Sequence, residues 1–298
     1  MLAPGMQLPA VVGASAPYQN TADMRTRGWE LSVNWRDQIG KVGYRVGFNL
    51  SDSQSKIVKY NSNESGILTS TLSNGSTFWN YYEGKDLGEI WGYEYDGFYT
   101  VDDFTDTSSW KLKEGVPSID GYNPRPGDVK FKNLMDDDRG TNMISGGDNT
   151  VSNPGDRKVI GNNTPRYLYG ITLGANFKGF DLNVFMQGTG KRDAWIANNL
   201  KFPLYSDFKF IALYKDLGNY WKPVDAANGD YTAANPNAEF PRIYGNYGNQ
   251  GSNYCQSDKY LSDASYFRIK NVTLSYTFPK AWITKASLSQ LKAFVSIE

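Results

Sequence analysis

Residues 166–191, RYLYGITLGANFKGFDLNVFMQGTGK, contain two alternating stretches that are joined only by Lys178 and Gly179. Side chains alternate across an extended strand, so every second residue lies on the same face. Apolar residues occupy one face of both stretches: Tyr167, Tyr169, Ile171, Leu173, Ala175, Phe177, Leu182, Val184 and Met186. Two such stretches around a two-residue turn predict a tight antiparallel β-hairpin.

A second hairpin is predicted nearer the start of the chain. Residues 28–37 (GWELSVNWRD) and 42–51 (VGYRVGFNLS) alternate in the same way around a short polar turn at residues 36–41.

A third pair of strands is predicted near the end of the sequence. Residues 266–280 and 291–298 alternate around a turn at residues 279–287. Arg268 and Lys270 would extend the apolar row of the first of these strands, so we expect its start to emerge into water.

The connections between the six strands alternate between short and long. The long ones run from Gln54 to Asn163 and from Thr189 to Ala264. Alternate connections of an antiparallel meander lie at opposite ends of the sheet, so all short turns are expected at one end. Strands of this length, a two-residue period and this asymmetry are typical of an outer-membrane β-barrel. A soluble β-sandwich shows the same alternation, but structureless loops this long are rare in compact soluble domains.

This interpretation fixes which side of each strand faces lipid. In the strand at residues 42–51 we expect Arg45 and Asn49 to face the lumen of the barrel. The residues expected to face outward are Val42, Tyr44, Val46, Phe48 and Leu50.

Composition excludes several other classes of protein. The 31 basic and 31 acidic residues balance, which does not favour a nucleic-acid-binding protein. The absence of histidine removes the usual general base and zinc ligand, and we predict that the chain is not an enzyme and holds no cofactor. Cys255 is the single cysteine, so the chain has no internal disulfide.

Several motifs resemble the C-terminal part of the SusC/RagA-type TonB-dependent outer-membrane transporters. They are RGWELSVNWRD, GEIWGYEYDGFYT, PGDVKFKNL followed by DRKVIGNNTPRYLYGITLGANFKGFDLNVFMQGTGKR, and SYFRIKNVTLSYTFPKAW. The motifs occur in the family's order and with its spacing, and they extend over nearly the whole chain.

The resemblance implies an all-β fold in which residues 1–298 form the C-terminal portion of a 22-stranded transmembrane barrel with long extracellular loops. The plug domain and the final strand are expected to be absent. The implied function is active import of oligosaccharides or peptides across a Gram-negative outer membrane. A SusD-like surface lipoprotein and the TonB complex are the implied partners. The alternative is a soluble β-rich carbohydrate-binding or adhesin domain.

The first long connection is rich in aromatic residues between Phe78 and Tyr99. Tryptophan and tyrosine rings stack on sugars and anchor protein partners. The candidate substrate- or partner-binding residues are Trp79, Tyr81, Tyr82 and Trp91. The competing interpretation is a small local core that folds this connection.

An acidic turn follows the PGDVKFKNL motif. Relatives carry a loop there that is reminiscent of a calcium site, whereas this chain has Met135 in place of an oxygen ligand and lacks the glycine of the sharp turn. Asp136, Asp137 and Asp138 are therefore interpreted as a solvated turn and no metal site is predicted; the alternative is that these three carboxylates hold a cation.

Overall fold

The computed structural model describes residues 2–4, 17–71, 77–119, 121–135, 143–196, 215–244, 252–284 and 287–298. The chain divides into two compact units. The sheet unit comprises Arg25–Lys56, Asn163–Asp193 and Asp263–Glu298. The loop unit comprises Met1–Met24, Ile57–Asn162 and Ala194–Ser262.

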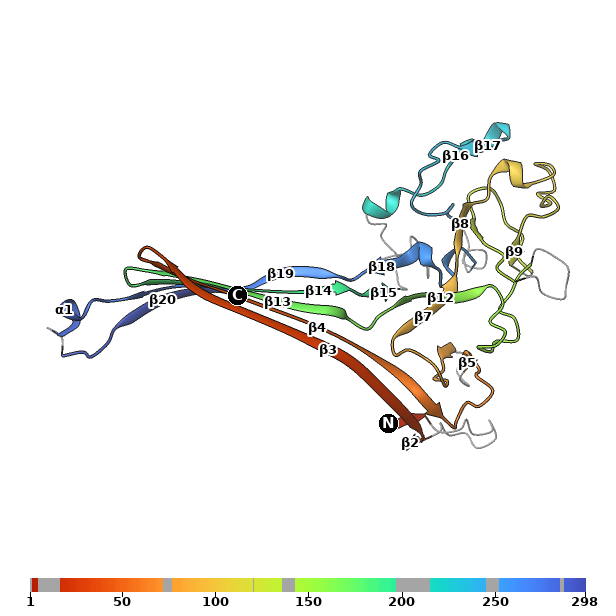
Figure 1. The fold of residues 1–298 in the computed structure, drawn as a ribbon. Helices are drawn as coiled ribbons and strands as arrows, with labels where there is room; N and C mark the ends of the chain where they lie inside the picture. Colours follow the sequence, from red (N-terminus) through yellow and green to blue (C-terminus); the bar gives the residue numbers. More distant parts are fainter. Residues whose placement is uncertain are drawn as a thin grey trace. The chain divides into compact units, whose positions relative to one another are not determined.

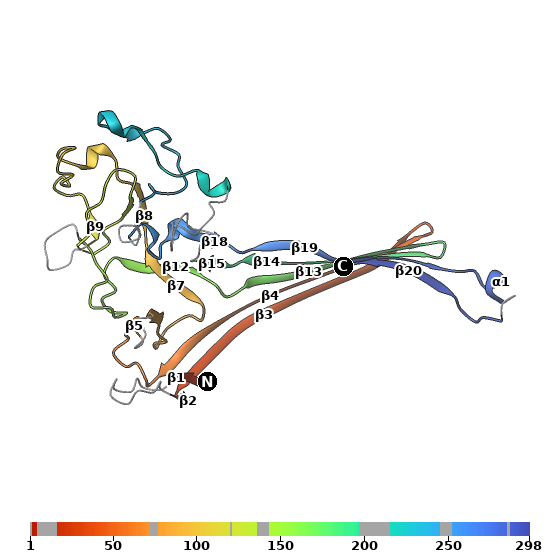
Figure 2. The same cartoon turned by 180° about the vertical axis from the view of Figure 1, so that it is seen from behind.

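The sheet unit is built on one six-stranded sheet, whose strands lie side by side in Figure 1 and Figure 2. Its strands are β3 (Ala22–Ile39), β4 (Val42–Tyr60), β13 (Arg166–Phe177), β14 (Phe180–Lys191), β19 (Tyr266–Thr277) and β20 (Lys292–Ile297). They follow the order β20-β19-β14-β13-β4-β3, and β20 with β19, β19 with β14, β14 with β13 and β13 with β4 pair antiparallel. All six predicted strands are therefore confirmed.

The β13–β14 hairpin has the predicted two-residue turn. Lys178 and Gly179 both have positive φ, 47° and 89°, and Phe177 pairs with Phe180 across the turn. Positive φ at both central residues matches the twist of the two strands, which favours a tight hairpin.

The three short connections lie at one end of the sheet. Asn176 pairs with Gly43, Phe180 with Tyr276, and Thr277 with Lys292, so all three turns follow directly from paired residues. The last connection contains a short helix, α1 (Lys280–Ile283). The long connections leave from the opposite end, where Leu168 pairs with Ser51 and Thr189 with Tyr266.

Residues in register across the sheet form apolar rows that alternate with polar rows. One row joins Val46, Leu173, Val184, Val272 and Ile297. The adjacent row joins Arg45, Gly174, Asn183, Thr273 and Ser296. The sheet therefore has an apolar face and a polar face, as the alternation predicts, with Arg45 on the polar face.

A β-bulge corrects the expectation for the start of the fifth strand. Phe185 pairs with Asn271 but Met186 pairs with Ile269, so Lys270 is the extra residue. The bulge exchanges the faces of the residues that precede it. Arg268 consequently pairs with Gln187 rather than extending the apolar row, and Ile269 takes the apolar position.

Two strands are longer than the alternation indicates. β3 has 18 residues and β4 has 19, so β4 includes residues 54–60, which the alternation places in the long connection. Backbone pairing needs no apolar side chain, and here polar groups face each other, with the hydroxyls of Thr26 and Ser55 2.8 Å apart.

The loop unit consists of short strand pairs and 3-10 turns rather than one large sheet. Its pairs are β1 (Leu2–Pro4) with β2 (Tyr18–Asn20), β5 (Thr69–Thr71) with β6 (Thr77–Trp79), β7 (Glu89–Tyr93) with β12 (Arg157–Asn162), β8 (Tyr95–Phe98) with β10 (Val129–Phe131), β9 (Ser118–Ile119) with β11 (Met143–Ile144), β15 (Asp193–Trp195) with β18 (Leu261–Asp263), and β16 (Pro223–Asp225) with β17 (Asp230–Ala233). Within the described residues, its apolar side chains gather in several small clusters instead of a single core.

Helix is scarce in this structure. Among the described residues, none of the helices has the length and the apolar sequence that crossing a membrane requires.

Candidate functional site

Tyr82 and Trp91 lie inside the loop unit. Their exposed fractions are 5% and 8%, and they pack with the fully buried Leu68. Trp91 Nε1 lies 3.1 Å from Tyr82 Oη and donates to Glu89 Oε1 at 2.8 Å, and Tyr82 Oη also donates to Glu89. Because their rings and polar atoms are used internally, these two residues form a local core.

Trp79, at the end of β6, is half-buried at the edge of the same cluster. Its Nε1 donates to Gln256 Oε1 at 3.2 Å, and the Arg157 guanidinium lies 5.8 Å from its ring centre. Part of the ring surface stays exposed, and the Arg157 cation is attracted to the electron-rich face of the ring.

Tyr81 belongs to a different cluster, with Ala22, Ile57 and Tyr60. It is also half-buried, and its ring meets Tyr60 edge-on at a centroid distance of 6.2 Å. The structure thus divides the four predicted aromatic residues between two neighbouring clusters.

A buried lysine lies between these clusters. The Lys85 amine donates to Asn80 O at 2.8 Å and lies 5.8 Å and 5.3 Å from the ring centres of Tyr81 and Tyr82. Burial lowers the pKa of Lys85 to about 8. The aromatic rings partly replace the water that a lysine normally keeps.

A hollow of about 260 Å³ adjoins the same region. Its lining is mostly polar: Lys59, Tyr60, Asn61, Asn63, Glu64, Gly66, Tyr82, Glu83 and Val151. Asn63 fixes its shape, because its amide donates to Tyr81 O at 2.7 Å and to Ile67 O at 2.8 Å. Hydroxyl-rich or peptide ligands suit a hollow with both acidic and basic groups.

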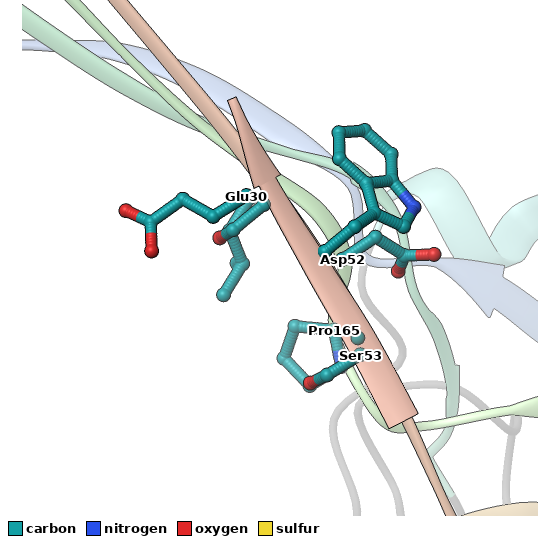
Figure 3. A pocket seen from close by; sticks show the side chains of 8 residues that line it. Glu30, Asp52, Ser53 and Pro165 are labelled. Carbon is teal, nitrogen blue, oxygen red and sulfur yellow. The ribbon is translucent and has the colours of Figure 1, made fainter. Parts of the chain in front are cut away.

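A second hollow, of about 320 Å³, lies in the sheet unit at the long-connection end of β4 (Figure 3). Arg166 forms a two-pronged ion pair with Asp52, whose side chain is only 8% exposed. Glu30 and Asp52 point to opposite sides of the ribbon (Figure 3). The ion pair ties the start of β13 to β4.

Two buried carboxylates that are not among the predicted site residues, Asp128 and Asp156, organise the loop unit. Asp128 accepts from Tyr244 Oη at 2.5 Å, Asn253 Nδ2 at 2.9 Å and Arg125 N at 2.7 Å. Burial raises the pKa of this carboxyl, although these hydrogen bonds oppose the rise.

Asp156 is 1% exposed and accepts from the backbone N–H groups of Leu134, Met135 and Ser145. Both aspartates lie in the quoted motifs and follow a glycine with positive φ, and an acidic residue directly after a turn glycine is the signal that could have pointed to them. They hold the backbone together and leave no free group for catalysis.

The structure offers no candidate metal centre in the part of the chain that it describes. There, Asp, Glu and Cys side chains form no group of three or more that could hold an ion. Asp136, Asp137 and Asp138 lie outside the described residues.

Known proteins with similar sequences are TonB-dependent receptors, although no family model matches the chain. TonB-dependent receptor P3 of Formosa agariphila is 26% identical over 97% of this chain, which covers 25% of that protein. Receptor P26 of the same bacterium is 22% identical over 91% of this chain, which covers 24% of it. The chain thus spans about a quarter of the length of these relatives.

Solved structures of a transporter have a similar fold. The RagAB peptide transporter matches 99% of this chain with a TM-score of 0.58 and 17% identity, and 27% of that protein is covered. The RagAB peptide importer in its open-open state gives a TM-score of 0.60 over the full chain, at 17% identity and with 28% of it covered.

These similarities establish the class of the fold: antiparallel β-barrel strands with long connections on one side. They also confirm the resemblance to SusC/RagA-type TonB-dependent transporters. The relatives and neighbours are named receptors, transporters and importers, and none of the names denotes an enzyme.

Proposed function

We propose that this chain is a membrane-spanning segment of an outer-membrane importer, active on oligosaccharides or peptides. The importer works with a SusD-like surface lipoprotein and draws energy from TonB. In this arrangement the apolar face of the sheet unit meets lipid, the polar face lines the lumen, and the loop unit lies outside the cell.

The observation that carries the proposal is the pair of alternating rows across five strands. In the apolar row, Val46, Leu173 and Ile297 are 41%, 39% and 69% exposed. A sheet with one exposed apolar face and one hydrogen-bonded polar face suits a barrel wall between lipid and water. In the alternative, a soluble carbohydrate-binding or adhesin domain, a second layer would bury the apolar row.

The substrate class rests on the loop unit. Trp79 and Tyr81 are the predicted aromatics with partly exposed rings, and Tyr60, whose ring meets that of Tyr81, lines the polar hollow of about 260 Å³. Stacking on half-exposed rings favours sugar rings or aromatic peptide side chains. The similar fold of a peptide transporter supports peptides as one of the two classes.

The test is uptake by cells of the parent organism that carry the full-length protein. A deletion strain is compared with the complemented strain for growth on peptides and on oligosaccharides as the carbon source. We expect growth on one class to require both the transporter and TonB, and the SusD-like lipoprotein to co-purify with the transporter.

Three results would contradict the proposed importer or one part of it. Fractionation of the full-length protein with the soluble material would support the soluble binding domain. Equal growth of the deletion and complemented strains on both substrate classes would remove the import function. Growth that does not depend on TonB would contradict only the part of the proposal that couples import to TonB.

A further inference from the structure

The polar hollow of about 260 Å³ in the loop unit carries three charged side chains of both signs. They are Lys59 near the end of β4, Glu64 in the turn that follows β4, and Glu83 in the turn after Tyr82. All three side chains are exposed, and the rest of the lining is uncharged. The hollow therefore presents one ammonium group and two carboxylates to solvent, one positive against two negative charges.

The protein itself uses none of these three charges. Within the described part of the chain, Lys59, Glu64 and Glu83 form no ion pair and no side-chain hydrogen bond. Two charged residues close to them in sequence are already engaged. Lys85 donates to Asn80 O at 2.8 Å, and Asp148 accepts from Thr150 N at 3.0 Å. The lysine and the two glutamates of the hollow remain available to a ligand.

Backbone hydrogen bonds hold the frame of the hollow in place. Ile57 N donates to Lys85 O at 2.9 Å, which ties the segment that contains Glu83 to β4. Val151 N donates to Gly66 O at 2.9 Å on another part of the lining. A preformed frame of this kind lowers the ordering cost that binding a ligand would otherwise carry.

The charges of the hollow distinguish the two substrate classes of the proposed importer. Sugar hydroxyls can donate to a carboxylate, but a neutral sugar leaves every charge of the hollow without a counter-charge. A short peptide with one basic side chain carries two ammonium-type charges and one carboxylate, which is the electrostatic complement of the hollow. The hollow is smaller than the roughly 300–1,000 Å³ of sites for drug-sized ligands, so it suits a ligand of about two residues.

We propose that this hollow binds dipeptide-sized peptides that carry one basic residue. Glu64 and Glu83 bind the α-ammonium group and the basic side chain, and Lys59 binds the α-carboxylate. Hydrogen bonds between charged groups are stronger than those between neutral groups. This inference rests on the proposed function and narrows its substrate class to peptides.

The experiment measures binding to the purified full-length transporter in detergent by isothermal titration calorimetry, with lysyl-alanine as the probe. The test variant is Glu64→Gln with Glu83→Gln. The matched control is Glu114→Gln, at an exposed glutamate of the same unit outside the hollow. We expect the double variant to bind lysyl-alanine roughly tenfold more weakly, about threefold for each carboxylate, and the control to bind normally. Maltose, a neutral disaccharide, should bind the natural protein more weakly than lysyl-alanine.

Lys59→Met tests the opposite charge with a pair of ligands. The natural protein should bind the C-terminal amide of lysyl-alanine about threefold more weakly than the free acid, whereas Lys59→Met should bind the two alike. Because this readout compares two ligands on one protein, a partial loss of folded protein does not imitate the expected result.

Three results would overturn the inference: equal binding of lysyl-alanine by the double variant and the natural protein, no binding of it by the natural protein, or tighter binding of maltose. The proposed function would survive any of these results if growth on peptides or on oligosaccharides still required the transporter. Equal growth with and without the transporter on both substrate classes would refute the proposed function itself, whatever the hollow binds.

Discussion

The side chain of Arg45 lies directly across the face of Gly174. A Cβ atom at position 174 would come within 2.4 Å of Arg45 Nε and 2.6 Å of Arg45 Cγ. From this position Arg45 reaches Asn183 and lies 3.5 Å from Asp181 Oδ2. The glycine thus allows one arginine to lie flat on the polar face and join β4 to β14 across β13.

Gly174→Val should therefore weaken the sheet. The valine displaces Arg45 and removes hydrogen bonds to a charged group, which gives an expected loss of about 1–3 kcal/mol. The measurement is the urea midpoint of the refolded full-length barrel. Thr172→Val, on the same face of the same strand, is the control. Addition of Arg45→Ser should restore most of the loss, and no rescue would mean that the clash with Arg45 is not the cause.

The local features of the sheet could be predicted from sequence because they depend on neighbouring residues. Lys178 and Gly179 between two alternating stretches define the hairpin without reference to the rest of the chain. The bulge at Lys270 depends on the count of residues in both β14 and β19, which no single stretch contains. Likewise, β4 continues through polar residues to Tyr60, where alternation gives no signal.

The candidate site was less predictable for a related reason. Aromatic spacing marked Trp79, Tyr81, Tyr82 and Trp91 but carried no information about which rings pack together. Burial of Tyr82 and Trp91 depends on Leu68 and on hydrogen bonds to Glu89. Such tertiary contacts have no periodic pattern in the sequence.

The two faces of β4 should tolerate charge very differently. Val46→Arg places a cation on the apolar face and should cost roughly 2–4 kcal/mol if the residue lies near the bilayer midplane. Asn49→Arg, on the polar face of the same strand, should be nearly neutral. Gly47 is a less suitable control because a Cβ there would lie 3.0 Å from Asn34 Oδ1. Folding yield in lipid vesicles is the measurement, and equal yields would contradict the assignment of the faces.

The two kinds of connection should lie on opposite sides of the membrane. Protease added to intact cells that express the full-length protein should cut within residues 54–163 or 189–264 and spare the turns. Each short turn follows directly from paired residues at one end of the sheet, so all three share one side. Mass spectrometry of the released peptides identifies the sites. Cleavage at Lys178-Gly179 in intact cells would show the opposite orientation.

Lys85 should make the stability of the loop unit depend on pH. Its pKa is lowered from 10.5 to about 8 by burial, so the folded state binds fewer protons than the unfolded state between these values. Stability therefore rises with pH in this window, and the cost of burying the ammonium group is complete below about pH 8. Lys85→Met keeps the aliphatic stem and removes this dependence.

The readout for Lys85 is the urea concentration at which subtilisin begins to cut the loop unit, at about pH 7 and about pH 9.5. The natural protein should gain resistance at the higher pH relative to Lys85→Met. Lys59→Met, at an exposed lysine of the same unit, should behave like the natural protein. A constant difference between the natural protein and Lys85→Met at both pH values would refute titration of Lys85 as the cause.

The half-buried aromatics should matter for capture and not for folding. A connection as long as residues 54–163 loses about 1–2 kcal/mol of backbone entropy for each residue that it orders. Internal packing of Tyr82 and Trp91 offsets part of that loss, whereas Trp79 and Tyr81 keep ring surface for a ligand or for the lipoprotein lid. Trp79→Ala with Tyr81→Ala should therefore reduce co-purification of the lipoprotein or substrate uptake and leave heat-modifiable mobility unchanged.

The matched control is Trp91→Ala, which removes a ring that a ligand does not reach. Truncating a buried tryptophan costs about 3–5 kcal/mol, so this change should increase protease cutting of the loop unit. Protease should cut the double variant at nearly the natural rate. Its two substituted rings lie at the edges of the clusters, and their loss leaves Leu68, Tyr82 and Trp91 packed. If protease instead cuts the double variant as fast as it cuts Trp91→Ala, then Trp79 and Tyr81 are part of the local core. Normal uptake and normal co-purification with the lipoprotein would lead to the same conclusion.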